Sequence, residues 1–386
     1  MLKPSLLPRM LGERALDGQR LKDSFARVTM HGDAMPLFFF SDLFLRHPET
    51  RDLFPVSMAV MRDRFLRALA TVVSRVDDID GLREYLRELG RDHRKFGTLA
   101  EHYPAVGVSL LATLAHFSAE NWTAELAADW KAAYDLVAET MISAAEEDAA
   151  TRPPFWEATV VAHELRRFDI AAFRVVTTEP LPYLPGQAVG MESAARPRIW
   201  RFYSIANAPR EDQTLDFHVR MIDGGTLSMV LARGLTVGTK LRLGAPVGRF
   251  TFDAGSGRDV LLVAGSTGLA PVKAILDQIS ALPEPPRVQL YFGARTEDAL
   301  YDLTGLEKLA TGFPWLAVVP AVSDEPGYQG ERGPLPDVVA RGGNWCDHEV
   351  YVAGPTAMVE AVQSRLAATG VPESQIHVED FGWSEV

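Results

Sequence analysis

One histidine in the first third of the chain is placed where it could bind a metal. His93 follows Leu82, Leu86 and Leu89 at steps of three and four residues, and the same steps lead on to Phe96. This spacing predicts that all five share one apolar face of a helix. An imidazole on such a face needs a hydrogen-bond partner or a metal ion. A hydrogen-bonded core histidine is the alternative that spacing alone leaves open.

The other histidines of this part have simpler expected places. His47 precedes a proline in a polar turn, His31 lies in a loop, and His102 stands at a helix start. No HExxH or similarly spaced set of histidine and carboxylate is present. We therefore do not expect a zinc or di-iron site made of protein ligands alone.

A glycine-rich turn follows an apolar run at residues 263–271 and opens a helix-like segment. Small residues there allow backbone N–H groups to approach the pyrophosphate of a dinucleotide. Many strand-to-helix turns are rich in glycine, so the neighbouring segments 292–295 and 352–355 add to the signal. The candidate nucleotide-binding residues are Gly265, Thr267, Gly268, Pro271, Gly354 and Pro355.

A third segment, Arg201-Phe202-Tyr203-Ser204, resembles the R-x-Y-S motif of ferredoxin-reductase-type flavin domains. The resemblance implies that Arg201 pairs with the flavin pyrophosphate, Tyr203 lies against the isoalloxazine, and Ser204 bonds near its reactive nitrogen. An ordinary strand with an exposed arginine is the alternative. Three further residues occur in the same family order and favour FAD binding: Gln187, Gly225 and Ser228.

The placement of glycine and proline indicates which elements hold these residues. Residues 1–152 contain 7 of the 30 glycines and 6 of the 25 prolines. So few helix breakers predict an all-helical first domain, which ends at Pro153-Pro154. Apolar periodicities over 65–73 and 106–117 predict two further helices.

The rest of the chain shows two other patterns. Short β-prone segments between turns predict an antiparallel barrel, with strands at 160–161, 168–176, 217–221 and 241–243. From Val260 strands alternate with helices, as in a parallel α/β sheet. Strands are expected at 260–264, 288–292, 316–320 and 350–353, and helices at 272–279 and 357–367. The expected domains are residues 1–152, 153–257 and 258–386.

Composition limits the setting of the protein. The 386 residues carry 51 acidic and 39 basic side chains, a net charge of −12, which disfavours nucleic acid as a partner. A single cysteine excludes an internal disulfide, a cysteine-based zinc site and an iron–sulfur cluster. The sequence shows no signal peptide and no apolar run of bilayer length. We expect a cytoplasmic protein without membrane insertion.

The order of these segments resembles the flavohemoglobin family. Residues 91–97 with 102–107 look like the F-to-G region of its globin, and residues 43–54 look like its B and C helices. The GRDHRK sequence around His93 is similar to divergent actinobacterial-type members. The resemblance runs from about residue 20 to 386 and implies an all-α globin, an antiparallel β-barrel FAD domain and a parallel-sheet NAD(P) domain. Residues 1–19 have no counterpart in it.

The resemblance also implies roles for single residues. It makes His93 the proximal ligand of heme b, Tyr103 the residue that orients its imidazole, and Phe54 a heme-packing residue. In the final segment, Glu379 and Phe381 match the region whose aromatic residue covers the flavin until nicotinamide displaces it. A packing aromatic is the alternative for Phe381. The choice between NADH and NADPH stays open, because Arg295 could face a 2′-phosphate or only solvent.

On the distal side the sequence departs from the family. Phe40 stands where the family has a tyrosine, Met61 where it has a glutamine, and Phe65 follows one turn later. None of these side chains donates a hydrogen bond to a bound ligand. The oxygen site is therefore expected to be altered.

On the proximal side two positions differ. Asp92 replaces a lysine that the family pairs with the acidic residue matching Glu379, and two carboxylates cannot form that bridge. The glutamate of the proximal network aligns at Ala145, where a shift of one residue to Glu146 restores it.

These features together lead to one expected activity and two alternatives. The resemblance implies that NADH or NADPH reduces FAD, that FAD passes electrons to heme, and that oxygen and nitric oxide are converted to nitrate. One alternative is an organic, peroxide or lipid substrate in an apolar distal pocket. The other is a ligand-binding or sensor globin whose reductase keeps the iron ferrous. Protein partners and the oligomeric state are unknown.

Overall fold

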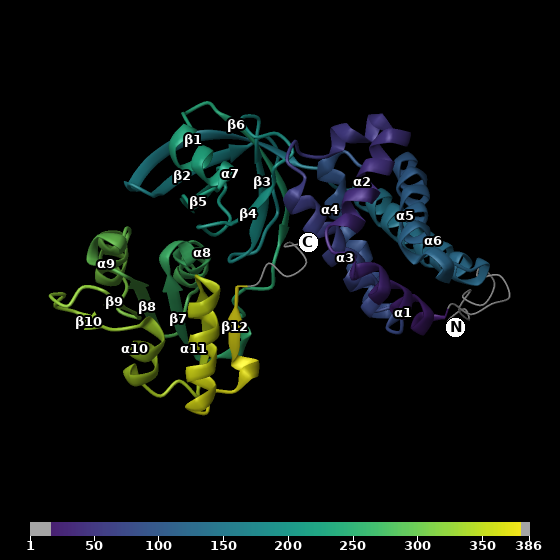
Figure 1. The fold of residues 1–386 in the computed structure, drawn as a ribbon. Coiled ribbons are helices and arrows are strands. Elements are labelled where there is room, and N and C mark those ends of the chain that lie inside the picture. The colour runs from purple at the N-terminus through teal and green to yellow at the C-terminus, as the bar shows by residue number, and fades with distance from the viewer. Residues whose placement is uncertain (1–16, 380–386) are drawn as a thin grey trace, which may run out of the picture. The chain divides into compact units, whose positions relative to one another are not determined.

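The computed structural model describes residues 17–379, which form two compact units, and the chain passes from one to the other between Pro154 and Phe155 (Figure 1). In the described part of the first unit all regular elements are helical. They are α1 (Gly18–Thr29), α2 (Ala34–Arg46), α3 (Ala59–Ser74), α4 (Ile79–His93), α5 (Tyr103–Ser118) and α6 (Ala124–Ala149). The expected all-α fold of this part is confirmed.

Local sequence sets the starts of these helices. The Asp78 carboxylate accepts from the Gly81 N–H at 3.1 Å at the start of α4, and Thr123 accepts from the Leu126 N–H at 3.2 Å at the start of α6. Such caps satisfy N–H groups that have no partner within the helix.

Helices α4 and α6 pack at unusually close range. A Cβ added to Gly90 of α4 would lie 2.4 Å from the Met141 carbonyl oxygen of α6, so only glycine allows this approach. Helix α4 ends at His93, and Phe96 lies in the 3₁₀ turn Arg94–Phe96 that follows. The expected helix face is therefore correct up to His93 and wrong for Phe96, because Gly97 in the left-handed region (φ +80°) redirects the chain.

The second unit begins with an antiparallel sheet. Its strands are β1 (Trp156–Arg167), β2 (Ile170–Thr177), β3 (Ala188–Ser193), β4 (Arg201–Ser204), β5 (Thr214–Arg220) and β6 (Lys240–Val247), paired in the order β4-β3-β6-β1-β2-β5. A bridge between Ile205 and Phe217 joins the two end strands, so the sheet closes as the expected barrel.

Two barrel strands differ from the prediction. The segment expected at 168–176 begins only at Ile170, because Phe168 and Asp169 form the turn after β1. Strand β3 was not expected, and all six of its residues are buried. A strand buried on both faces has no alternation of polar and apolar residues by which to recognise it.

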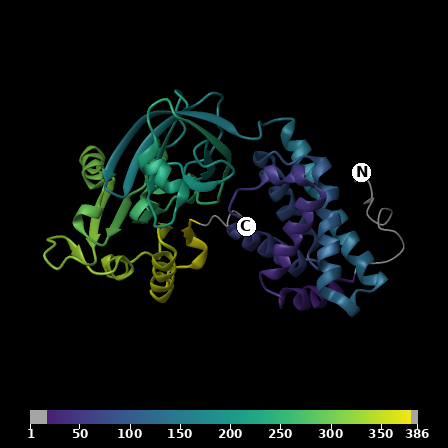
Figure 2. The same ribbon diagram turned by 45° about the horizontal axis from the view of Figure 1, so that its top comes forward.

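A parallel sheet follows (green to yellow in Figures 1 and 2). Its strands are β7 (Asp259–Gly265), β8 (Val288–Ala294), β9 (Leu316–Val322), β10 (Glu331–Arg332), β11 (His348–Ala353) and β12 (Ile376–Val378), in the order β10-β9-β8-β7-β11-β12. Its helices are α8 (Leu269–Ser280), α9 (Leu303–Gly312), α10 (Leu335–Gly342) and α11 (Thr356–Ala368). The strand order reverses between β7 and β11, and ligands of such sheets bind at that point, at the carboxyl ends of the strands.

No helix within residues 17–379 combines the length and the apolar character that a bilayer crossing requires.

Candidate functional site

The His93 ring is held at the last residue of α4 by its own helix. Its Nδ1 lies 2.8 Å from the Leu89 carbonyl oxygen, which can only accept, so Nδ1 carries the proton and Nε2 keeps its lone pair. Burial lowers the pKa of His93, which favours the neutral ring. A neutral imidazole with a free Nε2 and a backbone partner on Nδ1 is the form in which histidine binds metals.

The expected distal residues come together in one apolar cluster. The Phe40 ring centroid lies 5.4 Å from that of Phe54 and 5.5 Å from that of Phe65, in both cases edge to face. Met61 packs against the same core. These four residues from α2, α3 and the loop between them form a surface made of aromatic rings and one thioether, which provides no hydrogen-bond donor.

Tyr103 begins α5 and packs beside the α4 face that carries His93, in a core with Leu82 and Leu86. Burial raises the pKa of Tyr103 to about 12. Its carbonyl oxygen accepts a hydrogen bond of 2.5 Å from the Tyr134 hydroxyl. In the described part of the chain, the hydrogen bond of the His93 ring joins it to the Leu89 carbonyl oxygen and not to Tyr103. The orienting role of Tyr103 therefore stays a prediction.

A proximal role for Glu146, the residue that a shift of one position would supply, stays a prediction. The Glu146 side chain is exposed on α6, whereas Ala145 is half-buried. The next two acidic residues are both engaged: Glu147 with Arg87 at 2.5 Å and Asp148 with Arg94.

Sequence reasoning missed the partner of Asp92. The Lys95 ammonium donates to the Asp92 carboxylate at 2.5 Å, and the Lys95 side chain is only 3% exposed. Burial lowers the pKa of Lys95. The negative charge that Asp92 introduces beside His93 is thus balanced by the positive charge of Lys95, three residues later. This i,i+3 spacing could have predicted the pair from the sequence.

The candidate flavin residues gather around β4 of the barrel. In the antiparallel pairing of β3 and β4, Arg201 lies opposite Met191, Phe202 opposite Gly190, and Tyr203 opposite Val189. Burial raises the pKa of Tyr203. Gln187, at the end of the preceding loop, donates to the Gly248 carbonyl at 3.2 Å and so ties β3 to the end of β6.

The second glycine motif of the barrel lies at the start of α7 (Thr226–Met229). Gly225 precedes this helix, and the Ser228 hydroxyl donates to the Gly225 carbonyl at 3.2 Å.

Ser204 and Glu379 connect the barrel to the parallel sheet. The Ser204 hydroxyl at the end of β4 donates to the Glu379 carboxylate, and the Glu379 N–H donates to the Val352 carbonyl of β11 at 3.1 Å. Burial raises the pKa of Glu379 to about 7. Phe381 lies outside the described residues.

The glycine-rich turn and the segment after β11 lie against each other at the reversal point of the sheet. A Cβ added to Gly268 would lie 2.4 Å from the Ala353 carbonyl carbon and oxygen, so the contact requires glycine. Gly265 ends β7, and Thr267 stands in the short 3₁₀ turn after it. Pro271 is buried in the first turn of α8, and Gly354 and Pro355 lead into α11.

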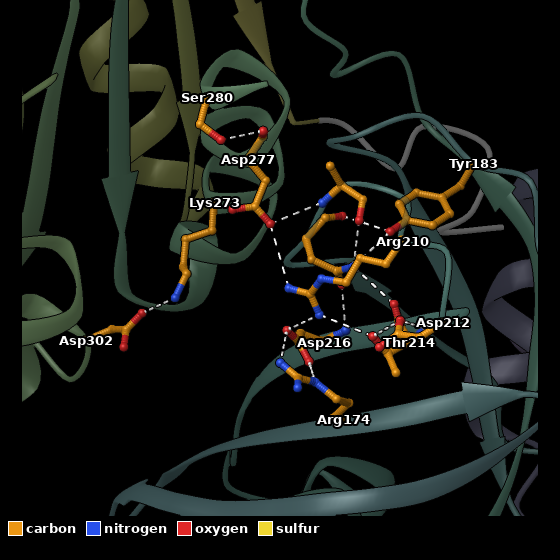
Figure 3. Close-up of polar contacts among 12 residues, drawn as sticks. Arg174, Tyr183, Arg210, Asp212, Thr214, Asp216, Lys273, Asp277, Ser280 and Asp302 are labelled. Carbon is orange, nitrogen blue, oxygen red and sulfur yellow. Dashed lines mark hydrogen bonds and ion pairs between the residues drawn. The ribbon is translucent and has the colours of Figure 1, made fainter. Parts of the chain in front are cut away.

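Ion pairs unforeseen from the sequence join the barrel to the sheet (Figure 3). Arg210 pairs with Asp216 of β5 at 2.9 Å and approaches Asp277 of α8 at 3.8 Å. The Asp277 carboxylate also accepts from the Ala208 N–H at 3.4 Å. Burial raises the pKa of Asp277.

A second set of contacts lies along the same boundary. The Tyr301 hydroxyl lies 2.8 Å from Nδ1 of His218, and burial lowers the pKa of His218 to about 4. Asp302 pairs with Lys273 and lies 3.6 Å from Arg166 of β1. These contacts fix the position of the two sheets of the second unit relative to each other. No local sequence motif predicts them.

The residues fit the three expected cofactors. His93 offers a neutral ring with a free Nε2, as a heme iron requires. Arg201 supplies a cation for a pyrophosphate, and the half-buried Ser204–Glu379 pair supplies polar groups at the end of the same strand. The tight packing of Gly268 on Ala353 sets the start of α8 at the reversal point of the sheet, where backbone N–H groups suit a pyrophosphate.

Three family descriptions match successive parts of the chain. Residues 37–141 match globin, residues 154–252 match the oxidoreductase FAD-binding domain, and residues 262–364 match the oxidoreductase NAD-binding domain. Heme, FAD and NAD(P) are the cofactors that these domains bind.

Comparison with whole proteins gives two kinds of relative. A flavohemoprotein of Bordetella pertussis (strain Tohama I) is 28% identical over 380 residues, covering 91% of this chain and 94% of that protein. A naphthalene 1,2-dioxygenase/salicylate 5-hydroxylase ferredoxin–NAD(P)(+) reductase component of a Ralstonia species is 34% identical over 227 residues, covering 58% of this chain and 68% of that protein. A xylene/toluene monooxygenase electron transfer component of Pseudomonas putida is 32% identical over 217 residues, and this chain spans 61% of its length.

Among solved structures, a flavohemoglobin from Malassezia yamatoensis with bound FAD and heme has a TM-score of 0.75. The alignment covers 96% of this chain and all of that one at 17% identity, which shows a shared fold.

Proposed function

The chain belongs to the flavohemoprotein family of NAD(P)H-, FAD- and heme-dependent oxidoreductases, and from this premise we propose that it converts nitric oxide and oxygen to nitrate at the expense of NADH or NADPH. When bound, FAD accepts a hydride and releases single electrons, and heme iron binds small gases. The proposed substrates are thus nucleotide, oxygen and nitric oxide.

The observation that carries this proposal is the His93–Leu89 hydrogen bond. It commits Nδ1 to the helix backbone and leaves Nε2 as the free ligand atom. A heme iron that takes His93 as its single protein ligand would keep a coordination position for a gas. Tyr103 is the proposed orienting residue beside it, and Phe40, Phe54, Met61 and Phe65 are the proposed distal surface.

The roles in flavin and nucleotide binding are assigned from the contacts described for the barrel and the parallel sheet. We assign flavin binding to the barrel residues Gln187, Arg201, Phe202, Tyr203, Ser204, Gly225 and Ser228, with Glu379 from the parallel sheet. Ser204 orients the Glu379 carboxyl, and Arg201 binds phosphate. Nucleotide binding falls to Gly265, Thr267, Gly268, Pro271, Gly354 and Pro355.

We keep residues 1–152, 153–257 and 258–386 as the proposed limits of the heme, FAD and nucleotide domains. Cytoplasmic location is part of the proposal, supported by the sequence composition.

One observation favours a second candidate function. The proposed distal surface consists of three aromatic rings and Met61, and such a surface suits an apolar organic molecule, a lipid or an organic peroxide better than a polar ligand. In that case the same reductase would serve a different substrate.

The test is nitrate formation by the full chain loaded with heme and FAD. We expect nitric oxide to disappear only when oxygen and NADH or NADPH are both present, with nitrate as the product. The His93→Ala variant should lose this activity and keep reduction of ferricyanide by NADH or NADPH. If the loaded protein consumes no nitric oxide and its heme spectrum shifts with fatty acids or organic peroxides, the second candidate replaces the first.

A further inference from the structure

Strand β5 turns one face to the core of the barrel and the other face to the parallel sheet. Its inward side chains are buried in the barrel core: Leu215, Phe217 and Val219. Because successive side chains of a strand point to opposite faces, His218 and Arg220 point the other way. Nδ1 of His218 lies 2.8 Å from the Tyr301 hydroxyl, and the Arg220 guanidinium donates to the Ser266 hydroxyl, in the turn after β7, at 3.3 Å. The outer face of β5 is therefore a direct contact between the two sheets.

Tyr301 holds its end of this contact within the parallel sheet. It lies just before α9, and its ring packs edge to face on the buried ring of Phe292 of β8, with 5.9 Å between the centroids. The next residue, Asp302, pairs with Lys273 of α8 (Figure 3) and lies 3.6 Å from Arg166 of β1. Two consecutive residues of the sheet thus contact two strands of the barrel.

The His218 ring is uncharged in this setting. Burial lowers its pKa to about 4, and burial raises the pKa of Tyr301. The charged groups that face His218 are two cations and two anions: Lys273, Arg166, Asp302 and Asp216. Its partner across the strand pairing is Ala172 of β2, which carries no charge. Above about pH 5.5 the contact is therefore a hydrogen bond between a neutral imidazole and a neutral phenol.

The contact connects the two elements that carry the proposed cofactor sites. Strand β5 is joined to the end of β4, the strand of the flavin motif, by the bridge between Ile205 and Phe217, next to His218. Strand β8, on which Tyr301 packs, pairs with β7, and the turn after β7 is the proposed nucleotide site. Hydride transfer needs the reacting atoms about 3–3.5 Å apart, and a misplacement of about 1 Å can cost roughly 100-fold in rate. A displaced contact here would change that distance.

We infer that His218 and Tyr301 are a positioning pair for flavin reduction, which fixes the barrel on the sheet so that the nicotinamide meets the flavin at hydride-transfer distance. Neither residue is assigned a contact with a cofactor or a proton of the reaction. A role in stability alone is the alternative that the experiment must distinguish. The inference rests on the reduction of FAD by NADH or NADPH within the proposed function, and it involves no step at the heme.

The experiment is anaerobic stopped-flow reduction of the flavin in the full chain loaded with heme and FAD. A series of NADH concentrations separates the limiting rate from the apparent Kd of the nucleotide. We expect His218→Ala and Tyr301→Phe each to lower the limiting rate about tenfold and to change the apparent Kd less than about twofold. The double variant should be no slower than the slower single variant, because each substitution already removes the same contact.

Two further variants serve as controls. In His218→Asn an amide group replaces the Nδ1 side of the ring, so it can still bond the Tyr301 hydroxyl, and the limiting rate should stay within about threefold of the original. Tyr291→Phe removes a hydroxyl from β8 of the same sheet, where the ring packs on Trp345, and should leave the rate unchanged. Reduction of the flavin by dithionite should be the same in all variants, since it does not depend on the nucleotide.

A second measurement needs no cofactor. Urea unfolding of the full chain before loading should show a smaller midpoint shift in the double variant than the sum of the two single shifts, as expected for residues in contact.

Three results would overturn the inference and leave the proposed function standing: an unchanged limiting rate in both single variants, multiplied rate effects in the double variant, or additive midpoint shifts. A lower urea midpoint with an unchanged limiting rate would assign the pair to stability alone. Flavin reduction that depends on the pair in a chain that forms no nitrate would overturn the proposed function and leave this inference intact.

Discussion

The hydroxyl of Ser204, at the end of barrel strand β4, donates a hydrogen bond to the carboxylate of Glu379, just beyond β12 of the parallel sheet, across 175 positions of the sequence. The contact lies at the boundary between the FAD-type barrel and the NAD-type sheet, and we propose that the hydride passes between their cofactors near this boundary. Burial gives this carboxyl a pKa of about 7, against an ordinary value of 4.5.

The first prediction concerns the pH dependence of flavin reduction. Glu379 should hold its proton below about pH 7 and accept from Ser204 above it, so the rate of flavin reduction by NADH should change with a midpoint near pH 7. Glu379→Gln should reduce the rate roughly tenfold or more and abolish that midpoint. Stopped-flow absorbance of the flavin between pH 5.5 and 8.5 provides the measurement, and a midpoint that persists in Glu379→Gln would assign it to another group.

The same carboxyl makes stability depend on pH. Because the pKa of Glu379 is higher in the folded chain than in the unfolded one, the folded state binds its proton more tightly. The free energy of unfolding attributable to this group should therefore fall as pH rises from about 4.5 to about 7 and level off above. Urea unfolding of the second unit should show this slope in the original chain and a smaller one in Glu379→Gln; equal slopes would contradict the assignment.

Phe40→Tyr should restore a hydrogen-bond donor on the distal side. Phe40 contacts Phe54 and Phe65, so a hydroxyl on its ring would be introduced among apolar groups, where a donor to a bound gas is most effective. We expect oxygen to dissociate roughly tenfold more slowly, the effect of one such hydrogen bond. Phe44→Tyr, one turn along α2, is the control, and flash photolysis measures both. An unchanged rate in Phe40→Tyr would show that this position does not face the ligand.

Asp148→Asn should destabilise the helical unit. Arg94 follows His93 directly and pairs with Asp148 at side-chain exposures of 10% and 8%, so the substitution leaves a buried guanidinium without its partner charge. The expected loss is about 3 kcal/mol of unfolding free energy. Asp135→Asn is the control, because its pair with Lys131 is exposed and should contribute less than about 0.5 kcal/mol. Urea unfolding followed by the helical circular dichroism signal compares them; similar losses in both would refute the argument from burial.

Gly268→Ala should block use of the nucleotide and spare the flavin. Its Cβ would lie 2.4 Å from the Ala353 carbonyl, so the turn after β7 would have to move away from β11. We expect reduction of the flavin by NADH to slow at least about tenfold while reduction by dithionite is unchanged. Gly312→Ala, where an added Cβ meets nothing within 4 Å, should behave like the original chain.

The sequence predicted those parts of the molecule in which a local pattern determines a local structure. Helix α4 with His93 at its apolar face, strand β4 with its R-x-Y-S motif, and the glycine turn before α8 all depend on neighbours within a few residues. Glycine and proline placement indicated the change from helices to strands near residue 153, because both residue types interrupt helices.

The remaining features depend on contacts between distant segments. Strand β3 lacks alternation because both of its faces are buried. Asp92 and Lys95 have the spacing of an ion pair on a helix. Whether the pair forms also depends on how far each charge is removed from water, and spacing alone does not show that burial. The contacts His218–Tyr301 and Ala208–Asp277 join residues 83 and 69 positions apart, and only the packing of barrel on sheet brings them together.

We propose that one chain delivers electrons from NADH through FAD to a heme held by His93. Anaerobic mixing of the loaded protein with NADH under carbon monoxide tests it most directly. Flavin absorbance should be lost first, followed by the appearance of the spectrum of the ferrous carbon monoxide complex, and this second phase should be absent in His93→Ala. Flavin reduction without any reduction of the heme, or the same second phase in His93→Ala, would rule out this electron path.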